Sequence, residues 1–86
     1  MTNDEFRAWL QGFFELSDED AVLNPEQVQV IVNHLNLAET VSGKLDQPNQ
    51  QLRDDISAFR SLPKPIAPEL FESFTLDMRC KVLAHK

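Results

Sequence analysis

The residues best suited to chemistry are an acidic run and a few scattered soft ligands. Asp18, Glu19 and Asp20 carry the carboxylate oxygens that calcium prefers. Counted from Asp18, however, an EF-hand loop requires glycine at its sixth position and glutamate at its twelfth, where this chain has Leu23 and Gln29. The run therefore predicts a capped, solvated turn rather than a calcium site.

Zinc, thiol and phosphate chemistry have no firmer basis. The two histidines and the single cysteine are His34, His85 and Cys80, which are too widely spaced to form a zinc motif. Cys80 has basic neighbours, as a redox thiol often has, but a small apolar residue near Met78 and Val82 requires no function. The chain has only two glycines, which leaves no phosphate-binding loop. We expect no enzymatic activity, no cofactor and no metal ion.

The net charge of −6 is concentrated in the N-terminal half of the chain. Residues 1–39 contain eight of the fourteen acidic residues but only one of the eight basic residues. We expect the basic C-terminal residues Arg79, Lys81 and Lys86 to fold back onto this acidic half. The alternative is that the acidic half faces a basic partner. Because no basic surface is clustered, we expect no direct binding of nucleic acid.

Composition and segment lengths favour one small cytoplasmic domain. The hydrophobic fraction of 42% is ordinary for a globular protein, and residues 1–86 suffice for a single domain. One cysteine allows no internal disulfide, and no apolar run is long enough to span a membrane. The N-terminus lacks the basic and apolar pattern of a secretion signal. No membrane association is expected.

The N-terminal acidic residues must be positioned by a helical hairpin over residues 3–42. Thr2 and Glu5 are spaced as a capping box, which predicts a first helix from about Asn3 to Leu16. Its wide apolar stripe consists of one tryptophan, three phenylalanines and a leucine: Phe6, Trp9, Leu10, Phe13 and Phe14. Gly12 interrupts the polar side of this helix, where it either lets another backbone approach closely or is merely tolerated.

The second helix of the hairpin has the clearest start signal. Asn24 is placed to cap it, Pro25 to occupy its first position and Gln27 its third. We expect it to extend from Pro25 to about Ala38, fraying toward Ser42, before Gly43 stops it. The two helices should pack antiparallel. The predicted core is Trp9, Phe13, Val28, Ile31 and Leu35.

The C-terminal half is expected to complete an all-α fold. Residues 43–48 are predicted as a loop, 49–60 as a short helix and 61–68 as a stiff proline connector. Residues 69–86 fit both a helical and a strand pattern. Apolar side chains recur every four residues from Leu70, as in a helix, and alternate with polar ones from Leu76, as in a strand. We expect a helix because no second strand pattern is present. The alternative is a strand exchanged with another subunit.

The hairpin sequence resembles a group of small proteins encoded in tailed-phage and prophage genomes. The resemblance rests on Phe6-x-x-Trp9-Leu10-x-Gly12-Phe13 and on Asn24-Pro25-Glu26-Gln27, and it covers about residues 3–37. Members begin with a Phe-x-x-Trp-Leu-x-Gly-Phe/Tyr helix, followed by a Pro-x-Gln helix. The resemblance implies a phage origin, the cytoplasm of a bacterial host and a helical hairpin, but no activity, cofactor or catalytic residue.

These features predict a non-catalytic protein-interaction module. The contact surface would be the exposed members of an aromatic set: Trp9, Phe13, Phe14, Phe71 and Phe74. The partner would be a host or phage protein or a second copy, because a homodimer suits so small a domain. The alternative is a host-takeover or counter-defence inhibitor, in which Asp18, Glu19 and Asp20 bind a basic surface of a host nucleic-acid-binding protein.

Overall fold

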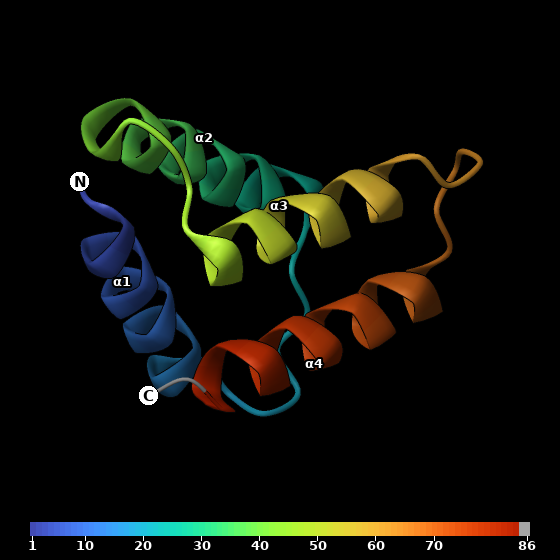
Figure 1. The fold of residues 1–86 in the computed structure, drawn as a ribbon. Coiled ribbons are helices and arrows are strands. Elements are labelled where there is room, and N and C mark those ends of the chain that lie inside the picture. The colour runs from blue at the N-terminus through green and yellow to red at the C-terminus, as the bar shows by residue number, and fades with distance from the viewer. Residues whose placement is uncertain (85–86) are drawn as a thin grey trace.

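The computed structural model describes residues 1–84 and contains four helices (Figure 1). They are α1 (Asn3–Leu16), α2 (Pro25–Ser42), α3 (Gln47–Arg60) and α4 (Pro68–Ala84). The described residues form no strand, so the all-α prediction is confirmed and the exchanged-strand alternative is wrong. The predictions made for His85 and Lys86 lie outside these residues.

Capping side chains fix where α1 and α2 begin. Thr2 Oγ1 accepts a hydrogen bond from the Glu5 amide at 3.2 Å, and the Glu5 carboxylate accepts one from the Thr2 amide at 2.9 Å. Asn24 and Gln27 repeat this reciprocal pair at the start of α2, at 2.8 and 2.9 Å. Both predicted capping boxes are therefore confirmed, and each satisfies backbone donors that the helix leaves unpaired.

Gly43 ends α2, as predicted, in a left-handed conformation with φ of 85°. The helix continues to Ser42, beyond the predicted end at Ala38. Helix α3 begins two residues earlier than predicted, because the Asp46 side chain caps it by accepting from the Asn49 amide at 3.2 Å. The predicted loop 43–48 is thus shortened to residues 43–46.

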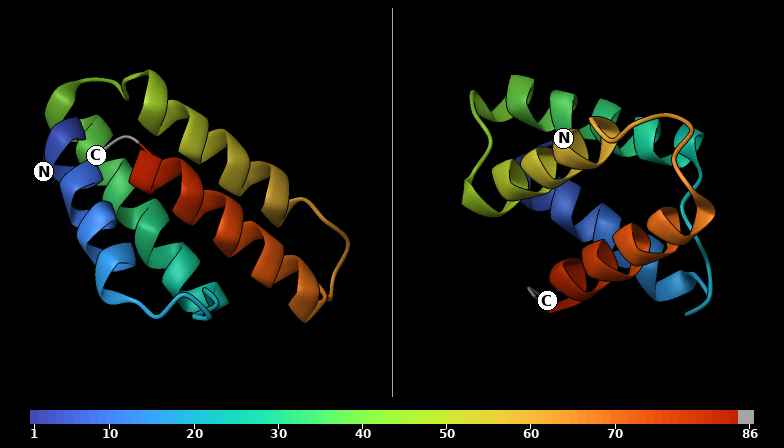
Figure 2. Two further views of the ribbon diagram at one scale, coloured as in Figure 1. Left: turned by 90° about the horizontal axis from the view of Figure 1, so that it is seen from below. Right: turned by 90° about the vertical axis from the view of Figure 1, so that its right-hand side faces the viewer.

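The helices pack around one shared core. Helix α1 contacts both α2 and α4, and α3 lies against α2. Helices α1 and α2 run in opposite senses, and the connector after α3 returns the chain so that α4 runs opposite to α3 (Figure 2). Side chains bridge α3 and α4, since the Phe59 ring stacks on Phe74 with centroids 4.2 Å apart. The core residues come from all four helices and two loops: Phe6, Leu10, Phe14, Leu23, Val28, Ile31, Leu35, Ala38, Leu45, Leu52, Ile56, Met78 and Val82.

This core corrects part of the sequence prediction. Val28, Ile31 and Leu35 are buried as expected, whereas Trp9 and Phe13 are only partly buried at its rim. Phe14 is 1% exposed, so it belongs to the core and not to a contact surface. The five-residue stripe of α1 is wider than one face, and packing against both α2 and α4 buries the side that contains Phe14.

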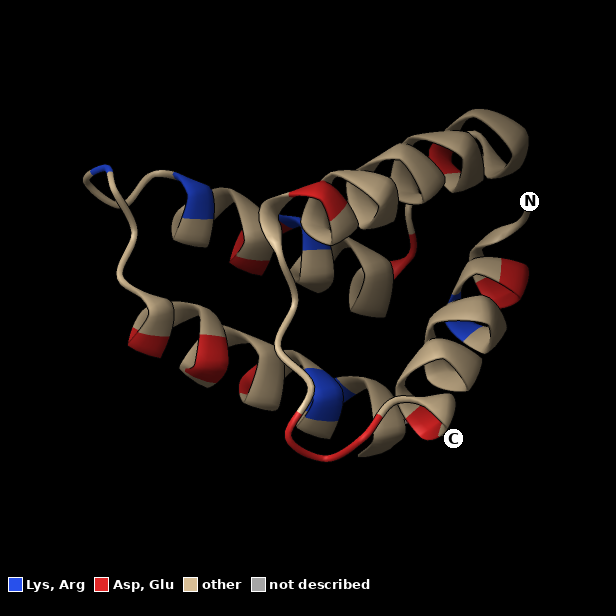
Figure 3. Ribbon diagram, turned by 180° about the vertical axis from the view of Figure 1, so that it is seen from behind, with Lys and Arg blue, Asp and Glu red and all other residues tan. Residues whose placement is uncertain are grey.

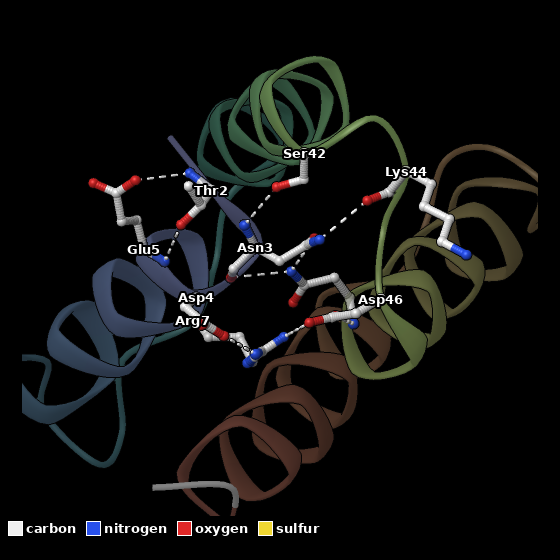
Figure 4. Close-up of polar contacts among 9 residues, drawn as sticks. Thr2, Asn3, Asp4, Glu5, Arg7, Ser42, Lys44 and Asp46 are labelled. Atoms are coloured by element: carbon white, nitrogen blue, oxygen red, sulfur yellow. Dashed lines mark hydrogen bonds and ion pairs between the residues drawn. The ribbon is translucent and has the colours of Figure 1, made fainter.

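A polar network anchors the start of α1 to the loop between α2 and α3 (Figure 4). Asn49 is fully buried, and its amide nitrogen donates to the side-chain oxygen of Asn3 at 2.9 Å and to the Asn3 carbonyl at 3.2 Å. Asn3 in turn donates to Ser42 Oγ and to the Lys44 carbonyl. Arg7 adds ion pairs, one of them to the α3 cap Asp46. The side-chain oxygen of Asn49 is buried without a partner among the described residues, but the hydrogen bonds that its amide nitrogen and Asn3 donate join α1 to α2 and α3.

Candidate interaction surfaces

The predicted aromatic contacts are divided between two sites. Trp9 lies at the seam of α1 and α2, where its ring stacks on His34 with centroids 4.1 Å apart and planes 6° apart. Phe71 and Phe74 lie on α4, and both rings contact Phe59 of α3, at 4.9 and 4.2 Å. These aromatic residues join helices and keep only part of their surface exposed. They do not form one continuous contact patch.

The outer face of α2 carries three exposed aliphatic side chains and one half-buried histidine in a line that we call the α2 stripe. It consists of Val30, His34, Leu37 and Val41, whose spacing of four, three and four residues aligns them along one side of the helix. Val30, Leu37 and Val41 are 43%, 54% and 57% exposed. His34 is half-buried under Trp9, and its Nδ1 lies 2.8 Å from the Val30 carbonyl oxygen.

Sequence reasoning missed the α2 stripe, although its signal was present. Val28, Ile31 and Leu35 already gave α2 one apolar face, and the structure buries that face in the core. Val30, Leu37 and Val41 form a second apolar line on α2. A helix that buries only one face does not require such a second line. Exposed apolar residues that are aligned and contiguous mark an interaction surface more often than scattered ones do.

The α2 stripe is free of charge along its length. The only acidic residues of α2 are Glu26 in its first turn and Glu39, and α2 contains no lysine or arginine. Glu39 is paired with Arg53 of α3 at 2.9 Å, so it faces the neighbouring helix. Neutral Asn33 and Thr40 border the stripe on its solvent side. Depletion of charge at the centre with a polar rim is the composition typical of protein–protein interfaces.

A second surface, which we call the acidic groove, lies between the loop 17–24 and α4. It has a volume of about 290 Å³ and is lined by Glu19, Asp20, Ala21, Val22, Glu72, Thr75, Leu76 and Arg79. Leu76 is 59% exposed and Val22 42%, so exposed apolar side chains form part of the groove lining. Figure 3 shows the acidic residues of the loop and of α4 along the same edge of the molecule.

Hydrogen bonds to α4 give the acidic groove a fixed shape. The buried Leu23 amide donates to Thr75 Oγ1 at 3.0 Å, and Thr75 donates to the Phe71 carbonyl at 2.7 Å. Arg79 Nη1 lies 3.3 Å from the Asp18 carbonyl oxygen, so one C-terminal cation folds back onto the acidic half as predicted. Lys81 does not, because it pairs with Asp55 and Asp77 at 2.9 and 3.0 Å.

These ion pairs raise the pKa of Lys81, chiefly through its hydrogen bond to Asp55 and then through that to Asp77. Its charge is therefore already neutralised locally by carboxylates of α3 and α4. Arg79 is the basic side chain that the structure places in the groove, beside Glu19, Asp20 and Glu72. The groove thus has more acidic than basic side chains and suits a cationic ligand.

Among residues 1–84, no three histidine, cysteine or acidic side chains are grouped to hold a metal ion. Within the same range, no helix has the length and apolarity needed to cross a bilayer. Comparison of the chain with known proteins finds no matching family model, curated protein or solved structure.

Proposed function

We propose that this protein is a small, non-catalytic interaction module whose main contact surface is the α2 stripe. The observation that carries the proposal is the alignment of three exposed aliphatic side chains, Val30, Leu37 and Val41, on a face without charge. They extend over about 16 Å of helix at the α-helical rise per residue. Half-buried Trp9 borders the line through its stack on His34, and tryptophan is enriched among residues that dominate binding energy.

A matched pair of charge insertions tests this proposal. Leu37 and Leu70 are 54% and 44% exposed, so Leu37→Asp and Leu70→Asp add the same charge at exposed helical sites on different surfaces. We would cross-link and co-purify the tagged protein in a bacterial host with each variant. We expect the cross-linked species, whether a second copy or another protein, to disappear only with Leu37→Asp. Loss with both variants, or no cross-linked species in the unaltered protein, would contradict the proposal.

The acidic groove supports a second candidate function, binding to a basic surface of a host nucleic-acid-binding protein. Its carboxylates belong to Glu19, Asp20 and Glu72, and its apolar lining residues Val22 and Leu76 would contact the aliphatic part of a lysine-rich helix. Such binding should weaken strongly as salt rises, because exposed charges are screened within about 8 Å at physiological ionic strength.

A lysine- and leucine-containing amphipathic peptide provides a defined probe for the groove. The double variant Glu19→Gln/Glu72→Gln should weaken peptide binding, whereas Glu26→Gln/Asp54→Asn makes the same charge change at exposed sites elsewhere. We would titrate both by fluorescence anisotropy at low and high salt. Equal weakening by the two variants would show attraction to net charge alone and would refute a specific groove.

The resemblance of residues 3–37 to phage-encoded proteins extends the proposal to a phage origin and to the cytoplasm of a bacterial host. Detection in extract of induced cells but not in purified particles would support an intracellular interaction role. Detection within the particles would instead indicate a structural role in the virion.

A further inference from the structure

We infer that the α2 stripe binds the α2 stripe of a second copy, antiparallel and about a two-fold axis that passes between residues 35 and 36. This inference rests on the proposed function and names its partner. An interface about a two-fold axis must be self-complementary, because the same residues face each other from both sides.

The spacing of the α2 stripe meets that requirement. About this axis Val30 faces Val41 of the other copy, and His34 faces Leu37 of the other copy. Because the interval of four, three and four residues is the same read in either direction, all four positions meet a stripe residue when the helices are antiparallel. Helices with this spacing pack side by side at a small crossing angle.

The charges at the two ends of α2 favour the antiparallel over the parallel orientation. Each chain carries a net charge of −6, so two copies repel overall, and contact through the uncharged α2 stripe adds no close pair of like charges to this repulsion. Glu26 lies in the first turn of α2, and Lys44 lies two residues beyond its last residue, Ser42. An antiparallel pair brings each Glu26 to the helix end that Lys44 follows. A parallel pair would place the two Glu26 residues together.

Trp9 extends the self-complementary surface along the side of α1. Its ring stacks on His34, and His34 lies next to the proposed axis. A second copy seated on the stripe would therefore cover the partly exposed indole of Trp9. On the other side, Asn33 and Thr40 would form a neutral rim that needs no desolvation of charge. Trp9 is the only tryptophan of the chain, so its fluorescence reports on the interface.

Sedimentation equilibrium of the full chain tests whether the partner is a second copy. We expect a dimer for the unaltered protein and for Leu70→Asp, and a dissociation constant at least about tenfold weaker for Leu37→Asp, which places two carboxylates in the interface. Far-UV circular dichroism should show the same helix content in all three. A monomer at the highest concentration, or an undisturbed dimer of Leu37→Asp, overturns the inference. If the unaltered protein is monomeric while Leu37→Asp still abolishes capture of another protein, the proposed function survives and the inference fails.

Disulfide trapping tests the register. In a Cys80→Ser background, which removes the exposed native thiol, Val30→Cys and Val41→Cys chains of different tag length would be mixed and oxidised with oxidised glutathione. We expect the disulfide that joins one variant to the other to exceed the disulfides within either variant alone. Predominant Val30–Val30 and Val41–Val41 products would show parallel pairing and overturn the antiparallel arrangement.

Discussion

Replacing each of the two glycines by alanine should change stability in opposite directions. Gly12 lies within α1, and a methyl group added there meets no atom of the described residues within 4 Å. Alanine is about 1 kcal/mol more favourable than glycine inside a helix, because glycine loses more backbone entropy on folding. With no steric cost to offset this gain, Gly12→Ala should raise the free energy of unfolding by about 1 kcal/mol. The melting temperature of so small a domain should rise by about 4–8 °C.

Gly43 provides the matched control. Added atoms also meet nothing within 4 Å there, but its φ of 85° lies in the left-handed region. An L-residue pays about 1–2 kcal/mol to adopt such a conformation. Gly43→Ala should therefore lower the free energy of unfolding by about that amount, although the side chain added is identical. The two variants differ only in the backbone conformation that the methyl group encounters.

Urea unfolding, followed by far-UV circular dichroism and by Trp9 fluorescence, measures both effects. The m-value should stay the same in the two variants, so that the midpoint alone reports the change. The experiment belongs at concentrations where the chain is monomeric, because Gly12 lies on the same helix as Trp9. A fall in stability for Gly12→Ala under those conditions would refute the assignment of open space around it.

Two further predictions concern single hydrogen bonds. Thr75→Val keeps the shape of the side chain but leaves the buried Leu23 amide unpaired, so it should cost about 1–3 kcal/mol in urea unfolding, whereas Thr75→Ser should cost less. The pKa of Glu5 is lowered below 4.5, chiefly by its hydrogen bond from the Thr2 backbone, so its contribution to stability is present at neutral pH and is lost as pH falls through the folded-state pKa. The urea midpoint of Glu5→Gln should accordingly depend less on pH between about 3 and 6 than that of the unaltered protein, and an identical pH dependence would contradict this assignment.

The sequence predicted helix starts well because caps are local. Thr2 with Glu5, and Asn24 with Gln27, satisfy backbone donors only three residues away, so spacing alone identifies them. Asp46 performs the same task for α3, yet in the sequence it reads as one more polar loop residue ahead of Pro48. The start of α3 was misplaced for that reason.

Burial was harder to predict because it depends on contacts that are distant in the sequence. Trp9 and Phe14 lie on one broad stripe, and only the positions of α2 and α4 decide that Phe14 enters the core. The acidic groove is a similar case. The run from Asp18 to Asp20 is evident in the sequence. Its position beside α4 depends on the hydrogen bond from the Leu23 amide to Thr75, which is distant in the sequence. Spacing within the run carries no information on Glu72 or Leu76.

The C-terminal segment shows why two periods in one sequence need tertiary structure to separate them. Met78 and Val82 satisfy both the helical and the strand pattern, and both are buried in α4. The residue that separates the patterns is Leu76, which a strand would bury on the same side as Met78. In the helix it is 59% exposed. The sequence contains no second strand to pair with, and the helix satisfies its own backbone bonds without one.

Helix α2 uses two different faces for two different tasks, and this separation makes the functional proposal testable. Val28, Ile31 and Leu35 are at most 2% exposed and hold the fold together, whereas Leu37 and Val41 contribute little to it. Truncation of Ile31 to alanine should therefore cost about 2–5 kcal/mol of folding free energy. Leu37→Asp should leave the free energy of unfolding of the monomer within about 0.5 kcal/mol of that of the unaltered protein, as exposed substitutions usually do. A loss of association without a loss of stability would assign the α2 stripe to binding, because a face needed for folding cannot be charged without destabilising the chain.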